Sequence, residues 1–165
     1  MAQLKTLTDL LAHEIQVMYS AENLLLTGIP RMIQHTENQA LKDAFLVHVN
    51  ETKQQVERLK QAADTLEIDP DGDGNPGMKG LLAEGEKVMH KDAEPGVLDA
   101  TLIAGAQKIE HYEIAGYGTI VALAKQLGYQ DLAELFQLSL DEEKKTDALL
   151  TQLAVRTVNP RAEEV

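Results

Sequence analysis

Two short acidic strings stand on neighbouring segments of helical pattern: Glu110-His111-Tyr112-Glu113 and Glu142-Glu143-Lys144-Lys145-Thr146-Asp147. Several of their carboxylates fall on the apolar stripes of those segments. A carboxylate is rarely buried in a core unless it is paired, protonated or bound to a metal. A helical chain that buries several of them is therefore expected to build a metal site.

The positions of the acidic residues repeat between the two halves of the chain. The first two helices are predicted to reverse near residue 38, and Glu22 and Glu51 lie at similar distances on either side of that turn. The last two reverse near residue 129, where Glu113 and Glu143 are placed in the same way. Because rise per residue is fixed in a helix, these carboxylates should meet at matching heights.

This pattern favours a site for two divalent metal ions with oxygen and nitrogen ligands. Helical bundle sites of this kind take one Glu from each of two helices and a Glu-x-x-His pair from each of the other two. Here the Glu-x-x-His motif is altered. The chain reads His48-x-x-Glu51 and Glu110-x-x-Glu113, and the last helix contains no His. The predicted ligands are Glu22, His48, Glu51, Glu110, Glu113, Glu143 and Asp147.

Apolar residues at helical spacing predict the elements that position these ligands. Four long helices are expected over residues 4–35, 40–66, 97–127 and 131–158, with Asn159-Pro160 ending the last, and a short helix over 78–90. The loop at 69–77 holds two prolines and three glycines. The fold class is therefore all-α, with residues 1–165 as one domain: two hairpins joined by a long crossover, the ferritin-like topology of a four-helix bundle.

The composition of the chain excludes several classes of partner and of metal site. The formal net charge of −12 argues against nucleic acid or an anionic membrane as partner, since both require basic patches. The absence of cysteine excludes disulfides, thiolate metal sites and iron–sulfur clusters. Neither a signal peptide nor a membrane-spanning run is evident, so a cytoplasmic location is expected.

Simpler interpretations of the same residues stay open. Each Glu could be an exposed or salt-bridged helix residue, and His48 could be a ligand, a partner of a ligand or a core histidine with satisfied hydrogen bonds. The aspartates at positions 69, 71 and 73 match the start of a calcium loop, but Gly80 stands where that loop needs Glu. A solvated turn is the alternative there.

The chain resembles the YciE/YciF family of ferritin-like bacterial stress-response proteins over nearly its whole length. The strings that carry the resemblance are Tyr19-Ser20-Ala21-Glu22, His48-x-x-Glu51-Thr52, the run from Ala106 to Ala115 and Glu142-Glu143-Lys144-x-Thr146-Asp147. The resemblance implies a four-helix ferritin-like bundle, a di-iron site and homodimers. It does not define a biochemical activity.

Two functions are consistent with these observations. The first is a dinuclear metal protein, with iron favoured over Mn or Zn, that oxidises Fe(II) with O₂ or peroxide. The second is a non-catalytic stress-protein scaffold or partner-binding dimer, with structural metal or none. Whether the protein is an enzyme is left undecided by the sequence.

Overall fold

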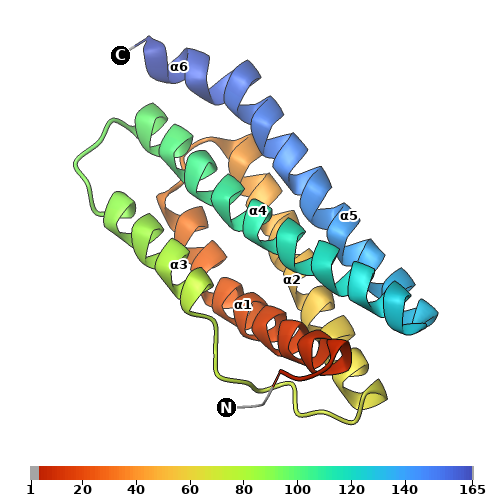
Figure 1. Ribbon diagram of the computed structural model, residues 1–165. Helices are drawn as coiled ribbons and strands as arrows, with labels where there is room; N and C mark the ends of the chain where they lie inside the picture. The colour runs from red at the N-terminus through yellow and green to blue at the C-terminus, as the bar shows by residue number, and fades with distance from the viewer. Residues whose placement is uncertain (1–3, 165) are drawn as a thin grey trace.

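The computed structural model describes residues 4–164 as a bundle of helices (Figure 1). The first hairpin pairs α1 (Leu7–His35) with α2 (Gln39–Thr65). Thr6 caps α1, since its hydroxyl accepts from the amide of Asp9 at 3.1 Å and the Asp9 carboxylate accepts from the amide of Thr6 at 2.8 Å. Asn38 caps α2 in turn, accepting from the amide of Leu41 at 3.1 Å. These caps fix where each helix begins.

The crossover carries the chain back along the bundle, as the sequence predicted. It contains α3 (Pro76–Met89), which Asn75 caps by accepting from the amide of Met78 at 2.8 Å. Because α3 returns the chain to the other end, α2 and α4 (Pro95–Leu127) run in the same direction (Figure 1). This is the connection expected of a ferritin-like bundle.

The second hairpin pairs α4 with α5 (Gln130–Leu153). Gly128 ends α4 with a φ of 81°, a left-handed conformation that favours glycine. The amide of Tyr129 then bonds to the carbonyl of Ala124 at 2.9 Å, which satisfies one of the last carbonyls of α4. The tight turn holds α4 and α5 as antiparallel neighbours.

The predicted end of the last helix at Asn159-Pro160 is wrong. The chain passes from α5 through a π-helical turn, η1 (Ala154–Val158), into α6 (Asn159–Glu163). The amide of Asn159 bonds to the carbonyl of Ala154, five residues earlier. Pro160 then occupies the first turn of α6, where its missing N–H is not needed, so the wider turn lets the helical path continue.

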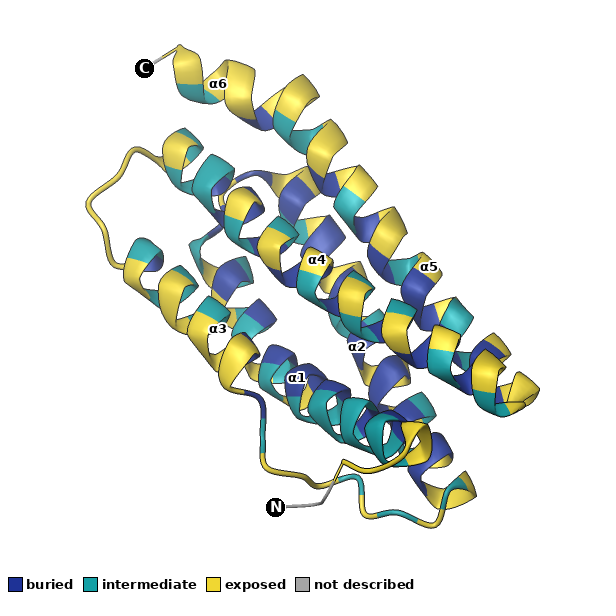
Figure 2. Ribbon diagram, in the orientation of Figure 1, coloured by how far each residue is buried: buried dark blue, intermediate teal, exposed yellow. Residues whose placement is uncertain are grey.

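The interior is built from two hydrophobic clusters, one toward each end of the bundle. The first includes Leu25 and Phe45, and the second includes Ile15, Leu59 and Phe136. The buried faces of the long helices point toward this interior, whereas α6 buries none of its residues (Figure 2). Over the described residues, none of the helices is both long and apolar enough to cross a membrane.

Candidate metal centre

A polar layer separates the two hydrophobic clusters. Each long helix passes from one cluster to the other, and between them it presents acidic or imidazole side chains to the interior. On α1, for example, Glu22 lies between Met18 of one cluster and Leu25 of the other, and all three are fully buried. The helical period that buries the apolar stripe therefore buries these polar side chains as well.

Four of the predicted ligands converge in this layer. His48 of α2, Glu110 and Glu113 of α4, and Glu143 of α5 each offer an atom, and these atoms all lie within 4.8 Å of one another. His48 Nε2 lies 3.2 Å from Glu110 Oε1 and 3.9 Å from Glu143 Oε2. Among residues 4–164, this is the one group of three or more such residues that converges to this extent, and the loop aspartates do not.

Glu22 of α1 and Glu51 of α2 lie outside this convergent group, in the same polar layer. Glu22 comes from α1, is fully buried and accepts a hydrogen bond from the hydroxyl of Tyr117. The Glu51 carboxylate lies 3.8 Å from His48 Nδ1, and its side chain keeps 17% of its surface exposed. Glu51 therefore contacts the second nitrogen of the His48 ring at the solvent side of the layer.

Asp147, predicted with the ligands, lies outside the group. Its Oδ1 accepts from Gln107 Nε2 at 3.0 Å, and its Oδ2 lies 3.4 Å from the Nε2 atom of the exposed His111. Thr146 turns inward instead, with 6% of its surface exposed. The reason is helical phase: α5 packs against α4 so that positions 143 and 146 face inward and position 147 faces the rim.

The layer contains many polar atoms without partners. Among the described residues, the buried side-chain atoms that lack a hydrogen bond are Glu22 Oε2, both ring nitrogens of His48, Thr52 Oγ1, Gln55 Oε1, Glu110 Oε2, both oxygens of Glu113 and Glu143 Oε2. An unpaired buried polar atom costs about 1–3 kcal/mol, more when it is charged. All of these atoms can serve as ligands of a hard or borderline cation or of its bound water. The donor set therefore fits a divalent metal.

The electrostatics of the layer are those of crowded carboxylates in a dry site. Burial, reinforced by the charge of Glu143, raises the pKa of Glu22 to about 8. Burial raises the pKa values of Glu110 and Glu113 well above the usual carboxyl range, and the neighbouring carboxylates add to the effect. Burial alone would lower the pKa of His48, but Glu51, Glu143 and Glu22 raise it above its usual value. In the metal-free protein these groups hold protons that a cation would displace.

A second set of side chains holds Glu143 and its neighbour in place. Gln55 donates from Nε2 to Glu143 Oε1, and also to Glu142 Oε2 at 3.0 Å. Arg58 donates to both oxygens of Glu142, at 2.6 and 2.8 Å. Arg58 also donates to the hydroxyl of the buried Ser139 at 3.1 Å. These contacts tie α2 to α5 beside the cluster.

Sequence reasoning did not predict Arg58 and Glu142 as parts of this centre. A signal was present, because Arg58 follows Gln55 by three residues and Glu51 by seven, which places it on the same face of α2. A cation placed one turn from a row of inward carboxylates is a natural partner for the acidic residue next to Glu143.

Comparison with known proteins places the chain among proteins of the same fold. Residues 6–163 match the family described as Domain of unknown function (DUF892). Protein YciF of Escherichia coli (strain K12) is 41% identical over 161 residues, which cover 97% of each chain.

Solved structures agree. The crystal structure of the E. coli stress protein YciF superposes with a TM-score of 0.90 at 41% identity, covering 94% of this chain and 99% of that one. YcfI from Rhodopseudomonas palustris, described as a candidate structural protein, gives a TM-score of 0.87 at 37% identity over 90% of this chain and 95% of that one. A protein from Xanthomonas campestris shares the fold at 21% identity, with a TM-score of 0.74 and coverage of 97% and 100%.

Proposed function

Because the chain belongs to the DUF892 family, whose relative YciF is a stress protein of E. coli, we propose that it is a dinuclear metal carboxylate protein of bacterial stress response. Iron is the favoured metal, with Mn or Zn as alternatives, and the reaction is oxidation of Fe(II) by O₂ or peroxide. The observation that carries this proposal is the row of buried, unpaired carboxylate and imidazole atoms between the two hydrophobic clusters.

The first ion would be held by the four convergent residues. His48 supplies a ring nitrogen, and the carboxylates of Glu110, Glu113 and Glu143 supply oxygens. Glu51, beside His48 Nδ1, would orient the ring so that Nε2 presents its lone pair to the ion, as carboxylates do in many metal sites. The metal would displace the protons that burial holds on Glu110 and Glu113.

The second ion would be held between Glu22 and the carboxylates it approaches. Carboxylate oxygens of Glu113 and Glu143 lie within 4.8 Å of each other. The charge of Glu22 acts on this pair, since it raises the pKa of Glu113. Glu113 and Glu143 can each offer one oxygen to either ion. The Tyr117 hydroxyl donates to one oxygen of Glu22, and the other oxygen has no hydrogen-bond partner and would be available to the ion.

The rest of the chain sets the conditions in which that site works. Iron, when bound, would supply the electrons that reduce O₂ or peroxide. Gln55 and Arg58 hold the Glu142–Glu143 segment in position, so that the site is formed before the ions arrive. The apolar clusters above and below exclude bulk water and strengthen each electrostatic contact inside the layer.

The test has two readouts. Anaerobic titration with Fe(II), followed by metal analysis, should give two ions per chain, and a hundredfold excess over Kd should stabilise the fold by about 2.7 kcal/mol for each ion. Stopped-flow absorbance after addition of O₂ or peroxide should then show oxidation of the bound iron. Glu143→Ala should abolish binding of the second ion and weaken binding of the first, whereas Lys144→Ala, on the exposed face of α5, should affect neither. Failure of Fe(II), Mn(II) and Zn(II) to bind or stabilise would refute the metal site.

A scaffold is the second candidate, favoured by the description of the relative YcfI as a candidate structural protein. In this case the protein would bind a structural metal or none, and no oxidation would follow. Binding of two ions with no absorbance change under either oxidant would therefore favour the scaffold. Homodimer formation and a cytoplasmic location stay predictions, and sedimentation analysis of the purified chain tests the first.

A further inference from the structure

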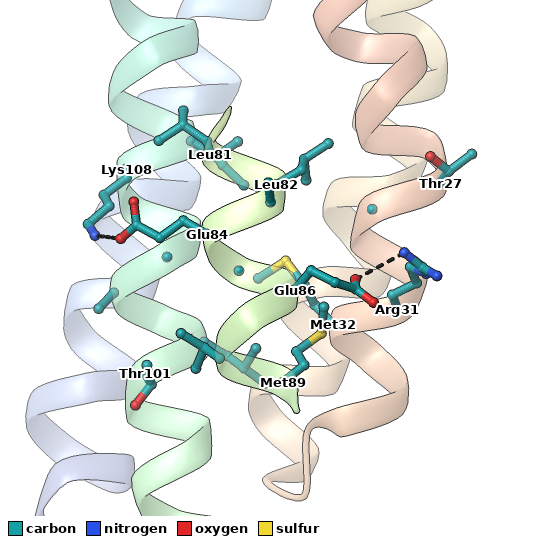
Figure 3. A pocket seen from close by; sticks show the side chains of 18 residues that line it. Thr27, Arg31, Met32, Leu81, Leu82, Glu84, Glu86, Met89, Thr101 and Lys108 are labelled. Atoms are coloured by element: carbon teal, nitrogen blue, oxygen red, sulfur yellow. Dashed lines mark hydrogen bonds and ion pairs between the residues drawn. The ribbon is translucent and has the colours of Figure 1, made fainter. Parts of the chain in front are cut away.

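A cavity of about 370 Å³ lies between α1, α3 and α4 (Figure 3). Helix α3 covers it and is anchored at both ends, since Met78 is fully buried and Met89 keeps only 8% of its surface exposed. Pockets that bind small molecules usually have volumes of roughly 300–1,000 Å³. The cavity is therefore large enough for a compact ligand, and none of its lining residues is a proposed metal ligand.

The lining is soft and apolar. Its main side chains are Met32, Leu81, Leu82, Met89, Leu102 and Ile109. Methionine side chains are flexible enough to fit ligands of different shapes, and their sulfurs make favourable contacts with the edges of aromatic rings. Met32 of α1 and Met89 of α3 both line the pocket (Figure 3). This lining suits a flat or ring-containing apolar molecule better than a polar one.

Glycines create much of the space. A methyl group added at Gly85 of α3 or Gly105 of α4 would meet no atom within 4 Å, so the volume beside each is open. At Gly28 of α1 the opposite holds, because an added Cβ would lie 2.6 Å from Leu82 Cδ2. Close approach at Gly28 holds α3 against α1, while Gly85 and Gly105 keep open the volume between α3 and α4.

The charges at the edge of the cavity are already paired. Arg31 Nη1 donates to Glu86 Oε2 at 3.0 Å, and Lys108 Nζ pairs with Glu84 Oε1 (Figure 3). Two cations face two carboxylates, so the rim has no net charge with which to hold an ionic head group. Both pairs join α3 to a neighbouring helix, and an anionic ligand would have to compete with Glu84 or Glu86 for its cation.

The geometry points to a binding site under α3 for a neutral, ring-containing apolar molecule. The ligand would insert between Leu82 and Ile109, in contact with the two methionines, and the ion pairs would stay closed beside it. This site is independent of the metal centre, because it shares no residue with the proposed ligands. Its ligand class is set by the paired rim and the thioether lining together.

The test uses two probes built on the same ring framework. N-phenyl-1-naphthylamine is neutral, and 1-anilinonaphthalene-8-sulfonate carries one negative charge. With the full-length protein in excess chelator, the neutral probe should bind at one saturable site per chain with enhanced fluorescence. The sulfonate should bind at least tenfold more weakly, and laurate should not displace the neutral probe. Because no metal is present, the result does not depend on the proposed metal centre.

Matched glycine variants locate the site. Gly105→Leu fills the cavity from α4 and should weaken the neutral probe at least tenfold. Gly118→Leu places the same side chain in open space on the same helix, outside the lining, and should leave binding unchanged. Gly85→Leu and Gly80→Leu form a second such pair on α3. Circular dichroism of each variant confirms folding.

Three outcomes would overturn the proposal. One is absence of saturable binding of the neutral probe to the folded chain. Another is tighter binding of the sulfonate or displacement by laurate, which would assign an anionic ligand to the cavity. The third is equal loss of binding in Gly105→Leu and Gly118→Leu, which would place the probe elsewhere.

Discussion

His48 Nε2 lies 3.2 Å from Oε1 of Glu110, and both side chains are almost completely buried. The contact joins α2 to α4, so it links the two hairpins through the polar layer rather than through either hydrophobic cluster. An imidazole and a carboxyl group this close titrate as a coupled pair. A proton or a metal ion bound to one of them changes the proton affinity of the other. We therefore expect the cluster to respond to pH, and to any metal that it binds, as one unit.

The first prediction concerns His48 as a ligand. His48→Gln should lower the affinity for the first ion by roughly 100-fold or more, since even the outer partners of metal ligands typically contribute 10–100-fold. His111→Gln is the matched control, because His111 lies on α4 with its side chain 69% exposed. Isothermal titration with Zn(II) and Fe(II) measures both. Equal affinities in the two variants would exclude His48 from the site.

The second prediction concerns the metal-free protein and pH. The pKa of Glu22 is raised to about 8 in the folded state, and those of Glu110 and Glu113 are raised as well. Glu in the unfolded chain has a pKa of about 4.3, so above that pH the folded protein binds more protons than the unfolded chain. The free energy of unfolding should therefore fall as pH rises from 5 to 8, by on the order of a few kcal/mol. The raised pKa of His48 acts in the same direction.

Urea unfolding in chelator at several pH values measures this slope. Glu22→Gln removes one titrating group from the layer and should flatten the slope. With saturating Zn(II) the dependence should reverse, because protons and metal compete for the same oxygens. Stability of the metal-free wild type that rises between pH 5 and 8 would contradict the cause assigned here, which is the burial of these carboxyl groups.

Much of this arrangement could be predicted from sequence because it follows from helical period. The stripe on α1 that places Met18 and Leu25 in the interior also places Glu22 there. The helical period alone does not predict the position of Asp147. A rotation of α5 by one residue about its axis would decide whether this side chain faces the interior or the rim. That rotation depends on how α5 packs against α4, which no local pattern specifies.

Other features depend on contacts between distant segments. The carboxylate of Asp99 on α4 accepts from the amides of Glu37 and Asn38 at 3.0 and 2.9 Å, in the turn between α1 and α2. Nothing near position 99 in the sequence indicates this partner. The continuation of the helix past Pro160 could not be predicted either. A proline in the sequence usually indicates that a helix ends, whereas here a π-helical turn before Pro160 lets the helix continue.

The third prediction follows from Asp99, whose surface is 4% exposed. Asp99→Ala should destabilise the protein by about 2–4 kcal/mol, since it leaves two amides of the first interhelical turn without their charged acceptor. Asp92→Ala, in the exposed loop before α4, should change stability by less than about 0.5 kcal/mol. Chemical denaturation measures both. Asp99→Asn should fall between them, because one acceptor oxygen is kept.

The last prediction concerns Arg58, which holds Glu142 with two hydrogen bonds while only 13% of its side chain is exposed. Arg58→Met keeps the length of the side chain but leaves Glu142 without its partner beside Glu143, so it should cost about 1–3 kcal/mol of stability. The uncompensated charge of Glu142 should also compete with Glu143 for the amide of Gln55, which now donates to both. The affinity for metal should therefore fall by roughly 10–100-fold, the usual effect of losing a partner of a ligand.

Lys60→Met removes an exposed ion pair on the same helix and should change neither the stability nor the metal affinity by a measurable amount. An Arg58→Met protein that loses stability but binds metal with wild-type affinity would show that Arg58 supports the fold without positioning Glu143.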